Sequence, residues 1–158
     1  MVSWPWKRRV EVITREQAGD DATAALAMIL RYHRRTVTID EVRQAIFRGE
    51  HRPSNALDLV QAAENYRLRG QGVRIDHPSF LQRITLPCIA HMSFGRASLE
   101  QPIDGHFAVI DRVTPSGAHL IDPYRGPSDD AYADLVDMWT GVVLVFEEAS
   151  AAPRAVLR

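Results

Sequence analysis

The side chain best suited to covalent chemistry in this sequence is Cys88, the single cysteine of the chain. A thiol attacks a substrate as its thiolate, which forms in an electropositive and partly exposed setting. Cys88 instead lies between Pro87 and Ile89 in a mostly apolar run, 86–92, that predicts a buried strand. A free cysteine in such a strand behaves as a small hydrophobic residue. We therefore expect a structural role for Cys88.

Histidines and acids are the other groups that could act as catalysts or ligands. Most of the histidines lack a cysteine or carboxylate at the spacing of a zinc site, so we predict no metal and no other cofactor. The adjacent acids Asp20 and Asp21 precede a run of small apolar residues, where a capping aspartate would stabilise a helix by about 0.5–2 kcal/mol. The histidines expected in surface or packing roles are His33, His51, His77, His91 and His119.

The bulk composition is that of a globular protein without an obvious charged partner. A chain of 158 residues fits one domain with one hydrophobic core. The 19 basic and 20 acidic residues leave a net charge of −1, so no nucleic-acid partner is predicted. No apolar run approaches the about 20 residues of a membrane span, and the N-terminus lacks the apolar core of a secretory signal. We therefore expect a cytoplasmic domain, in agreement with the single cysteine.

The chain changes from helical to strand periodicity near its middle. Three helices are expected, over 20–30, over 39–47 with Thr38 and Glu41 as a capping box, and from a cap at Ser54 to Tyr66. Helices followed by strands imply an α+β domain with a mainly antiparallel sheet. The expected strands span 10–13 (a strand or an extended arm), 68–75, 86–92, 106–113, 118–121 and 142–146, with short helices near 79–83 and 132–138.

Both ends of the chain differ from the middle. Residues 1–9 combine two tryptophans with three cations, and we expect an N-terminal arm whose rings fold back on the core or contact a membrane or partner. Residues 149–158 are rich in alanine and show no apolar periodicity, as expected of a linker or disordered tail. The folded domain is therefore predicted to span residues 10–148.

The order of five motifs resembles that of a known family. The motifs are the small-residue helix that starts at Asp20, Leu86–His91, Gly105–Phe107, Ile121–Pro123 and Trp139–Leu144. Their order is similar to that in the bacteriocin-processing cysteine peptidases, the thirty-ninth cysteine peptidase family. Its members are papain-like leader-peptide proteases, usually found at the cytosolic N-terminus of peptide-exporting ABC transporters. The resemblance covers most of Val10–Phe146 and implies a papain-like fold, with N-terminal helices packed on a mainly antiparallel sheet.

The resemblance places two retained and two altered functional positions on this chain. His106 matches the general base of the family, and Asp122 matches the acid that orients it. The nucleophilic cysteine falls on Asp21, and the glutamine that helps to hold the oxyanion falls on Arg15. Gln17 could replace that glutamine only if the loop were two residues shorter. We expect Arg15, Asp21 and His106 to form a charged cluster, with Asp21 paired to Arg15 and His106 in its protonated form.

These substitutions predict binding without cleavage. A carboxylate is a poor nucleophile toward an amide, and loss of an oxyanion-hole amide alone costs about 100- to 1,000-fold in rate. What the resemblance then implies is a catalytically inactive domain that binds a leader peptide or unfolded cargo at the cytosolic face of the inner membrane. Its further partners would be the membrane and ATPase domains of an ABC transporter.

Two alternatives belong to other functional classes. One is an active peptidase of cysteine or atypical type, in which His106 and Asp122 work through a water molecule or through Cys88. It predicts turnover that is lost in His106→Ala. The other is a purely structural interaction domain, in which the pair of Arg15 and Asp21 closes the cleft and contacts are made elsewhere.

Overall fold

The computed structural model describes residues 8–93 and 106–149. The predicted α+β class is confirmed, because helices come first and strands follow. Residues 1–7 and 150–158, which make up most of the predicted arm and tail, lie outside this range. The elements are α1 (Arg15–Ala18), α2 (Asp21–Tyr32), α3 (Ile39–Phe47), α4 (Ala56–Glu64), β1 (Leu68–Arg74), the 3-10 helix η1 (Pro78–Arg83), β2 (Cys88–Met92), β3 (Phe107–Val113), β4 (Gly117–Asp122), β5 (Gly126–Ala131), α5 (Tyr132–Met138) and β6 (Trp139–Glu148).

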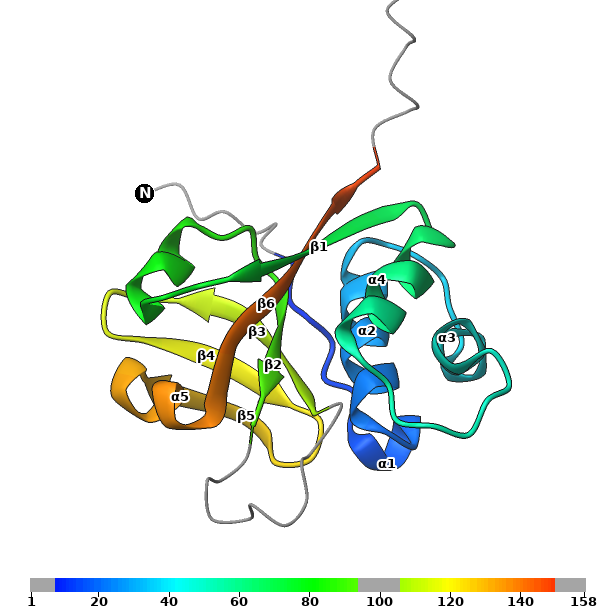
Figure 1. Ribbon diagram of the computed structural model, residues 1–158, viewed down its shortest axis with the longest axis horizontal. Helices are drawn as coiled ribbons and strands as arrows, with labels where there is room; N and C mark the ends of the chain where they lie inside the picture. The colour runs from blue at the N-terminus through cyan, green and yellow to red at the C-terminus, as the bar shows by residue number, and fades with distance from the viewer. Residues whose placement is uncertain (1–7, 94–105, 150–158) are drawn as a thin grey trace, which may run out of the picture.

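The strands form one antiparallel sheet in the order β1-β6-β2-β3-β4-β5. Helices α1 to α4 gather on one side of this sheet, whereas α5 and η1 lie on the other side (Figure 1). The last strand, β6, runs between β1 and β2, so the C-terminal part of the chain is central to the sheet. The fold therefore has three layers, with helices above and below the strands.

Side-chain alternation along the strands gives each face of the sheet its own core. Ile89 in β2 belongs to the buried cluster under α1 to α4, whereas its neighbours Cys88 and Ala90 belong to the cluster under α5 and η1. Phe107 and Ala108 in β3 divide in the same way. The described residues thus form two buried clusters, where the sequence analysis expected a single core.

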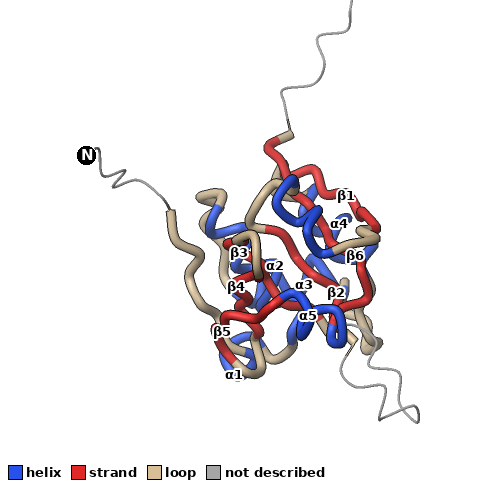
Figure 2. Tube along the Cα trace, turned by 90° about the vertical axis from the view of Figure 1, so that its left-hand side faces the viewer, coloured by secondary structure: helices blue, strands red, loops and turns tan. Residues whose placement is uncertain are grey.

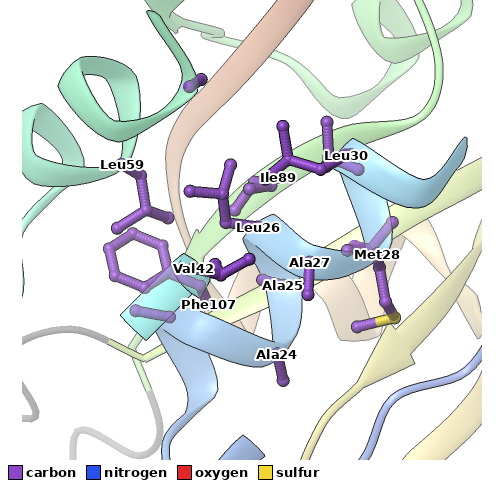
Figure 3. Close-up of a cluster of buried hydrophobic side chains, with 14 of the residues drawn as sticks. Ala24, Ala25, Leu26, Ala27, Met28, Leu30, Val42, Leu59, Ile89 and Phe107 are labelled. Carbon is purple, nitrogen blue, oxygen red and sulfur yellow. The ribbon is translucent and has the colours of Figure 1, made fainter. Parts of the chain in front are cut away.

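Helix α2 is the centre of the larger cluster. All of its residues from Ala22 to Leu30 are buried, because the helix is enclosed by the sheet on one side and by other helices on the other. Its alanines let these neighbours approach closely, and Leu26 packs in one cluster with Leu59 of α4 and Phe107 of β3 (Figure 3). Complete burial of a side chain such as Leu26 contributes about 1.5–3 kcal/mol relative to exposure. This packing fixes where the first turn of α2 lies.

Local capping sets the helix boundaries. The predicted box at α3 is confirmed, since the Thr38 side chain accepts from the Glu41 amide and the Glu41 side chain accepts from the Thr38 amide. The predicted cap of α4 is wrong by one residue: Asn55, not Ser54, accepts from the Asp58 amide at 2.9 Å, and α4 ends at Glu64. Asn55 is the better cap of the two because the Asp58 side chain accepts from its amide in return.

Two elements were missed by the sequence analysis. The short helix α1 begins after Thr14, and strand β5 is a polar edge strand that forms by pairing with β4. Residues 10–13 are part of an extended loop without regular secondary structure that leads to α1 (Figure 2). The other predicted strands are present, although β2 begins only at Cys88 and β6 is longer than expected at both ends.

Candidate active site

Three elements bring Asp21, His106 and Asp122 together. Asp21 is the first residue of α2, behind the N-cap Asp20, whose side chain accepts from the Thr23 amide at 2.7 Å. His106 directly precedes β3, and Asp122 is the last residue of β4. Because β3 and β4 are antiparallel neighbours, the start of β3 and the end of β4 lie side by side at the same end of the two strands.

His106 lies between two carboxylates. Its Nδ1 atom is in hydrogen-bond contact with Oδ2 of Asp21, and its Nε2 atom lies 3.1 Å from Oδ2 of Asp122. The His106 and Asp122 side chains are only 3% and 1% exposed, and that of Asp21 is 12% exposed. The Met92 amide also donates to the His106 carbonyl at 3.0 Å, which ties the backbone of His106 to β2. The imidazole ring is therefore held on both sides.

The two carboxylates favour the charged form of His106. Burial alone would lower the pKa of His106, but the hydrogen bonds and negative charges of Asp122 and Asp21 raise it above its ordinary value. Burial would likewise raise the pKa of Asp122, and here the hydrogen bonds from His106 and from the amides of Tyr124 and Arg125 lower it instead. The surroundings of His106 therefore favour its protonated form, which the sequence analysis expected.

Arg15 lies at the rim of this cluster. Its amide donates to the Pro123 carbonyl at 2.7 Å, which joins α1 to the turn after β4. Its Nε atom is 3.8 Å from Oδ1 of Asp21, and its guanidinium lies 5.8 Å from the ring centroid of Tyr124. The Arg15 side chain is 56% exposed. The expected ion pair with Asp21 is thus present as a long contact at a solvent-exposed edge.

Gln17 does not take the place of the missing amide. Its side-chain oxygen accepts from the Thr14 amide at 3.0 Å, and its own amide donates to the Thr14 hydroxyl, so the pair forms the capping box of α1. Gly19 then adopts φ 86°, a conformation that favours glycine, and leads the chain directly into α2. Gln17 is therefore committed to the helix that carries Arg15.

Cys88 lies on the other face of the sheet. It belongs to the buried cluster under α5 and η1, and burial raises the pKa of its thiol to about 12. At neutral pH the side chain is a neutral thiol and cannot supply a thiolate. The structure agrees with the structural role expected from the sequence.

Other histidines form contacts away from this cluster. His119 pairs with Asp111 at 2.5 Å on the neighbouring strand, and His91 lies 3.2 Å from the Thr140 hydroxyl. Within residues 8–93 and 106–149, no group of three histidine, cysteine or acidic side chains could hold a metal ion. No described helix combines the length and apolar character required to span a bilayer.

Sequence reasoning missed two residues at the rim. Arg125 places its Nε atom 3.7 Å from Oδ2 of Asp122, and Tyr124, which faces Arg15, is 70% exposed. Both residues directly follow Asp122 and Pro123, a pair that is typical of a turn. A turn at this point would return the chain toward Asp122, and this was the signal in the sequence that could have identified them. The cluster thus has a negative interior around His106 and a positively charged, aromatic edge.

Helices packed on an antiparallel sheet, with a paired histidine and aspartate facing the first turn of a buried helix, are the arrangement of a papain-like peptidase domain. Residues 9–151 match the sequence model of one family, the Peptidase C39 family. The chain therefore belongs to the Peptidase C39 family, and the resemblance noted in the sequence is confirmed.

Comparison with individual proteins agrees with this membership. The chain is 26% identical over 141 residues to the probable microcin-H47 secretion/processing ATP-binding protein MchF of Escherichia coli. That alignment covers 88% of this chain but only 18% of the relative. The chain therefore corresponds to a small part of the length of that protein.

Solved structures show the same fold. The double glycine motif protease from an AMS/PCAT transporter, crystallised in complex with the leader peptide, superimposes with a TM-score of 0.73 at 29% identity, over 90% of this chain and 96% of that one. The peptidase domain of Streptococcus ComA, a bi-functional ABC transporter involved in quorum sensing, gives a TM-score of 0.74 at 17% identity, over 89% and 99% of the two chains. The predicted papain-like fold is confirmed.

Proposed function

We propose that this chain is a catalytically silent peptidase domain that binds a leader peptide or unfolded cargo. The observation that carries the proposal is the contact between Asp21 and His106 at the start of α2, where the family resemblance puts the nucleophile beside its base. A cysteine at this position would give up its proton to the imidazole and attack as a thiolate. Asp21 instead keeps His106 protonated, and its attack on an amide would yield a reactive anhydride.

The altered rim supports the same conclusion. Arg15 stands where the family glutamine would hold the oxyanion, and its exposed side chain is directed toward Asp21 and Tyr124. Restoring only the nucleophile would leave a rate deficit of about 100- to 1,000-fold from this position. Cys88 offers no substitute, because it is buried on the opposite face of the sheet.

Binding of a leader peptide is supported by the relatives. One solved structure of this fold, 29% identical to the chain, contains the leader peptide, and a curated relative is a secretion/processing ATP-binding protein. Recognition of an amphipathic helix in a groove needs apolar anchors but no nucleophile. We infer that the chain works next to the membrane and ATPase domains of an ABC transporter, on the cytoplasmic side of the membrane.

Cleavage and binding can be measured on the same sample. The chain is mixed with a synthetic precursor, an amphipathic leader that ends in Gly-Gly and continues for several residues, and the mixture is analysed by mass spectrometry and isothermal titration calorimetry. We expect saturable binding and no cleavage products. Turnover beyond one equivalent that is lost in His106→Ala would contradict the proposal and favour the active-hydrolase alternative. The binding surface is mapped by NMR from the amide chemical shifts that change when the peptide is added. Changes that lie only far from Asp21 and His106 would favour the structural alternative.

A further inference from the structure

One oxygen of the Asp21 carboxylate is buried without a hydrogen bond. Oδ2 contacts His106, but Oδ1 has no hydrogen-bond partner among the residues that the structure describes. Arg15 Nε, at 3.8 Å, is too far away to donate. Buried acceptors in folded proteins are almost always paired, so Oδ1 favours a ligand that brings a hydrogen-bond donor. A peptide bound next to Asp21 would present such donors as its backbone amides.

The same cluster disfavours a ligand that brings a negative charge. Asp21 and Asp122 are both acidic, and both ring nitrogens of His106 are engaged by these two side chains. A free carboxylate next to Oδ1 would bring no hydrogen-bond donor and would meet the like charge of Asp21 in a poorly solvated site, which is unfavourable. Arg15 would attract such a carboxylate, but its side chain is 56% exposed, and exposed ion pairs contribute little. The charged form of His106 contacts Oδ2 of Asp21, and Arg125 contacts Asp122, so neither of these positive groups lies at Oδ1, where Asp21 itself sets the repulsion.

We propose that Asp21 makes this domain selective for the uncut precursor, an inference that rests on the proposed function. Oδ1 of Asp21 accepts a hydrogen bond from a backbone amide of the intact peptide. The negative charge of Asp21 disfavours binding of a cut leader, which ends in a free C-terminal carboxylate. Arg15 is the movable group that gives access to Oδ1, because its long side chain lies at the exposed rim while Asp21 is only 12% exposed. A silent domain of this kind retains cargo until it is processed and does not retain the product.

The test compares three peptides that share one leader sequence ending in Gly-Gly. The first continues past the two glycines, the second ends there as a free acid, and the third ends there as a carboxamide. Dissociation constants are measured by calorimetry with the whole chain. We expect the acid to bind at least about tenfold more weakly than the carboxamide, because only the acid brings a second carboxylate to Asp21. The continued peptide and the carboxamide should bind with similar affinity.

The isosteric variant Asp21→Asn separates charge from shape. In this variant the dissociation constant of the acid peptide, divided by that of the carboxamide peptide, should fall to about one, since the amide group of asparagine does not repel a carboxylate. Thermal unfolding of the variant serves as the folding control. Equal affinities of acid and carboxamide for the unmodified chain would overturn the selectivity while leaving leader binding intact, and this comparison needs no variant. Failure of all three peptides to bind would overturn both proposals.

Discussion

Asp21 and His106 are in hydrogen-bond contact although 85 positions separate them in the chain. The contact joins the first turn of α2 to the start of β3, while Asp122 holds the opposite nitrogen of the ring. In a working peptidase of this fold the imidazole must be able to take a proton from the nucleophile. Here Asp21 and Asp122 favour the protonated ring, which is the basis for the proposal that the framework of the family is kept without its cleavage chemistry.

The titration of His106 should depend on Asp21. Burial acts against the imidazolium, but Asp122 and Asp21 together raise the pKa of His106 above its ordinary value of 6.5. Asp21→Asn removes one of these charges and should lower this pKa. An NMR titration of the imidazole carbon shifts measures the change. Asp111→Asn, which removes a carboxylate next to His119 elsewhere in the sheet, is the matched control and should leave His106 unaffected.

Folding stability should fall on both sides of an intermediate pH. The raised pKa of His106 means that its stabilisation is complete below its unfolded value and is lost as pH rises through the folded one. The lowered pKa of Asp122 means that its stabilisation is complete above its unfolded value and is lost as pH falls through the folded one. Urea unfolding across a pH series measures both limbs. In Asp122→Asn the acid limb should flatten, and a profile parallel to that of the unmodified chain would contradict this account.

The sequence was most informative where local chemistry decides the structure. Thr38 and Glu41 predicted the start of α3, and one of the two acids expected to cap the first helix, Asp20, is the N-cap of α2. Strand β5 had no such signal, because its polar residues form a strand only through pairing with β4. Helix α1 did have a local signal, the capping box of Thr14 and Gln17, although only a loop was expected there.

The site shows a similar division. The family motifs placed Asp21, His106 and Asp122 in one cluster, and the structure brings them together. The Oδ1 atom of Asp21, which has no hydrogen-bond partner within the described part of the chain, and the contact of Arg125 with Asp122 both depend on side-chain packing across separate elements. Spacing along the chain contains no information about such distances, so these features could be found only in the fold.

The position of the site depends on the packing of α2, which gives a test of the core. Leu26 is fully buried, and Leu26→Ala should destabilise the domain by about 2–5 kcal/mol through lost burial and a cavity. Leu57 on α4 is 60% exposed and provides the control, since Leu57→Ala should change the free energy of unfolding by no more than about 0.5 kcal/mol. Chemical denaturation measures both values. Equal losses in the two variants would contradict the assignment of α2 as the packed centre.

The strongest test of the site is an attempt to restore cleavage. Asp21→Cys would place a thiol at the N-terminus of α2 beside His106, where a positive imidazole and the helix dipole lower a thiol pKa. This new thiol should therefore react rapidly with iodoacetamide near neutral pH, while Cys88, with its pKa of about 12, should react only after unfolding. Adding Arg15→Gln should then permit cleavage of a Gly-Gly precursor, and Asp21→Cys alone should be about 100- to 1,000-fold slower. Arg15→Gln alone is the control and should show no turnover. A folded double variant with a reactive thiol but no cleavage would mean that the site has lost more than the side chains at positions 15 and 21, and the proposal of a peptidase silenced at these two positions would have to be abandoned.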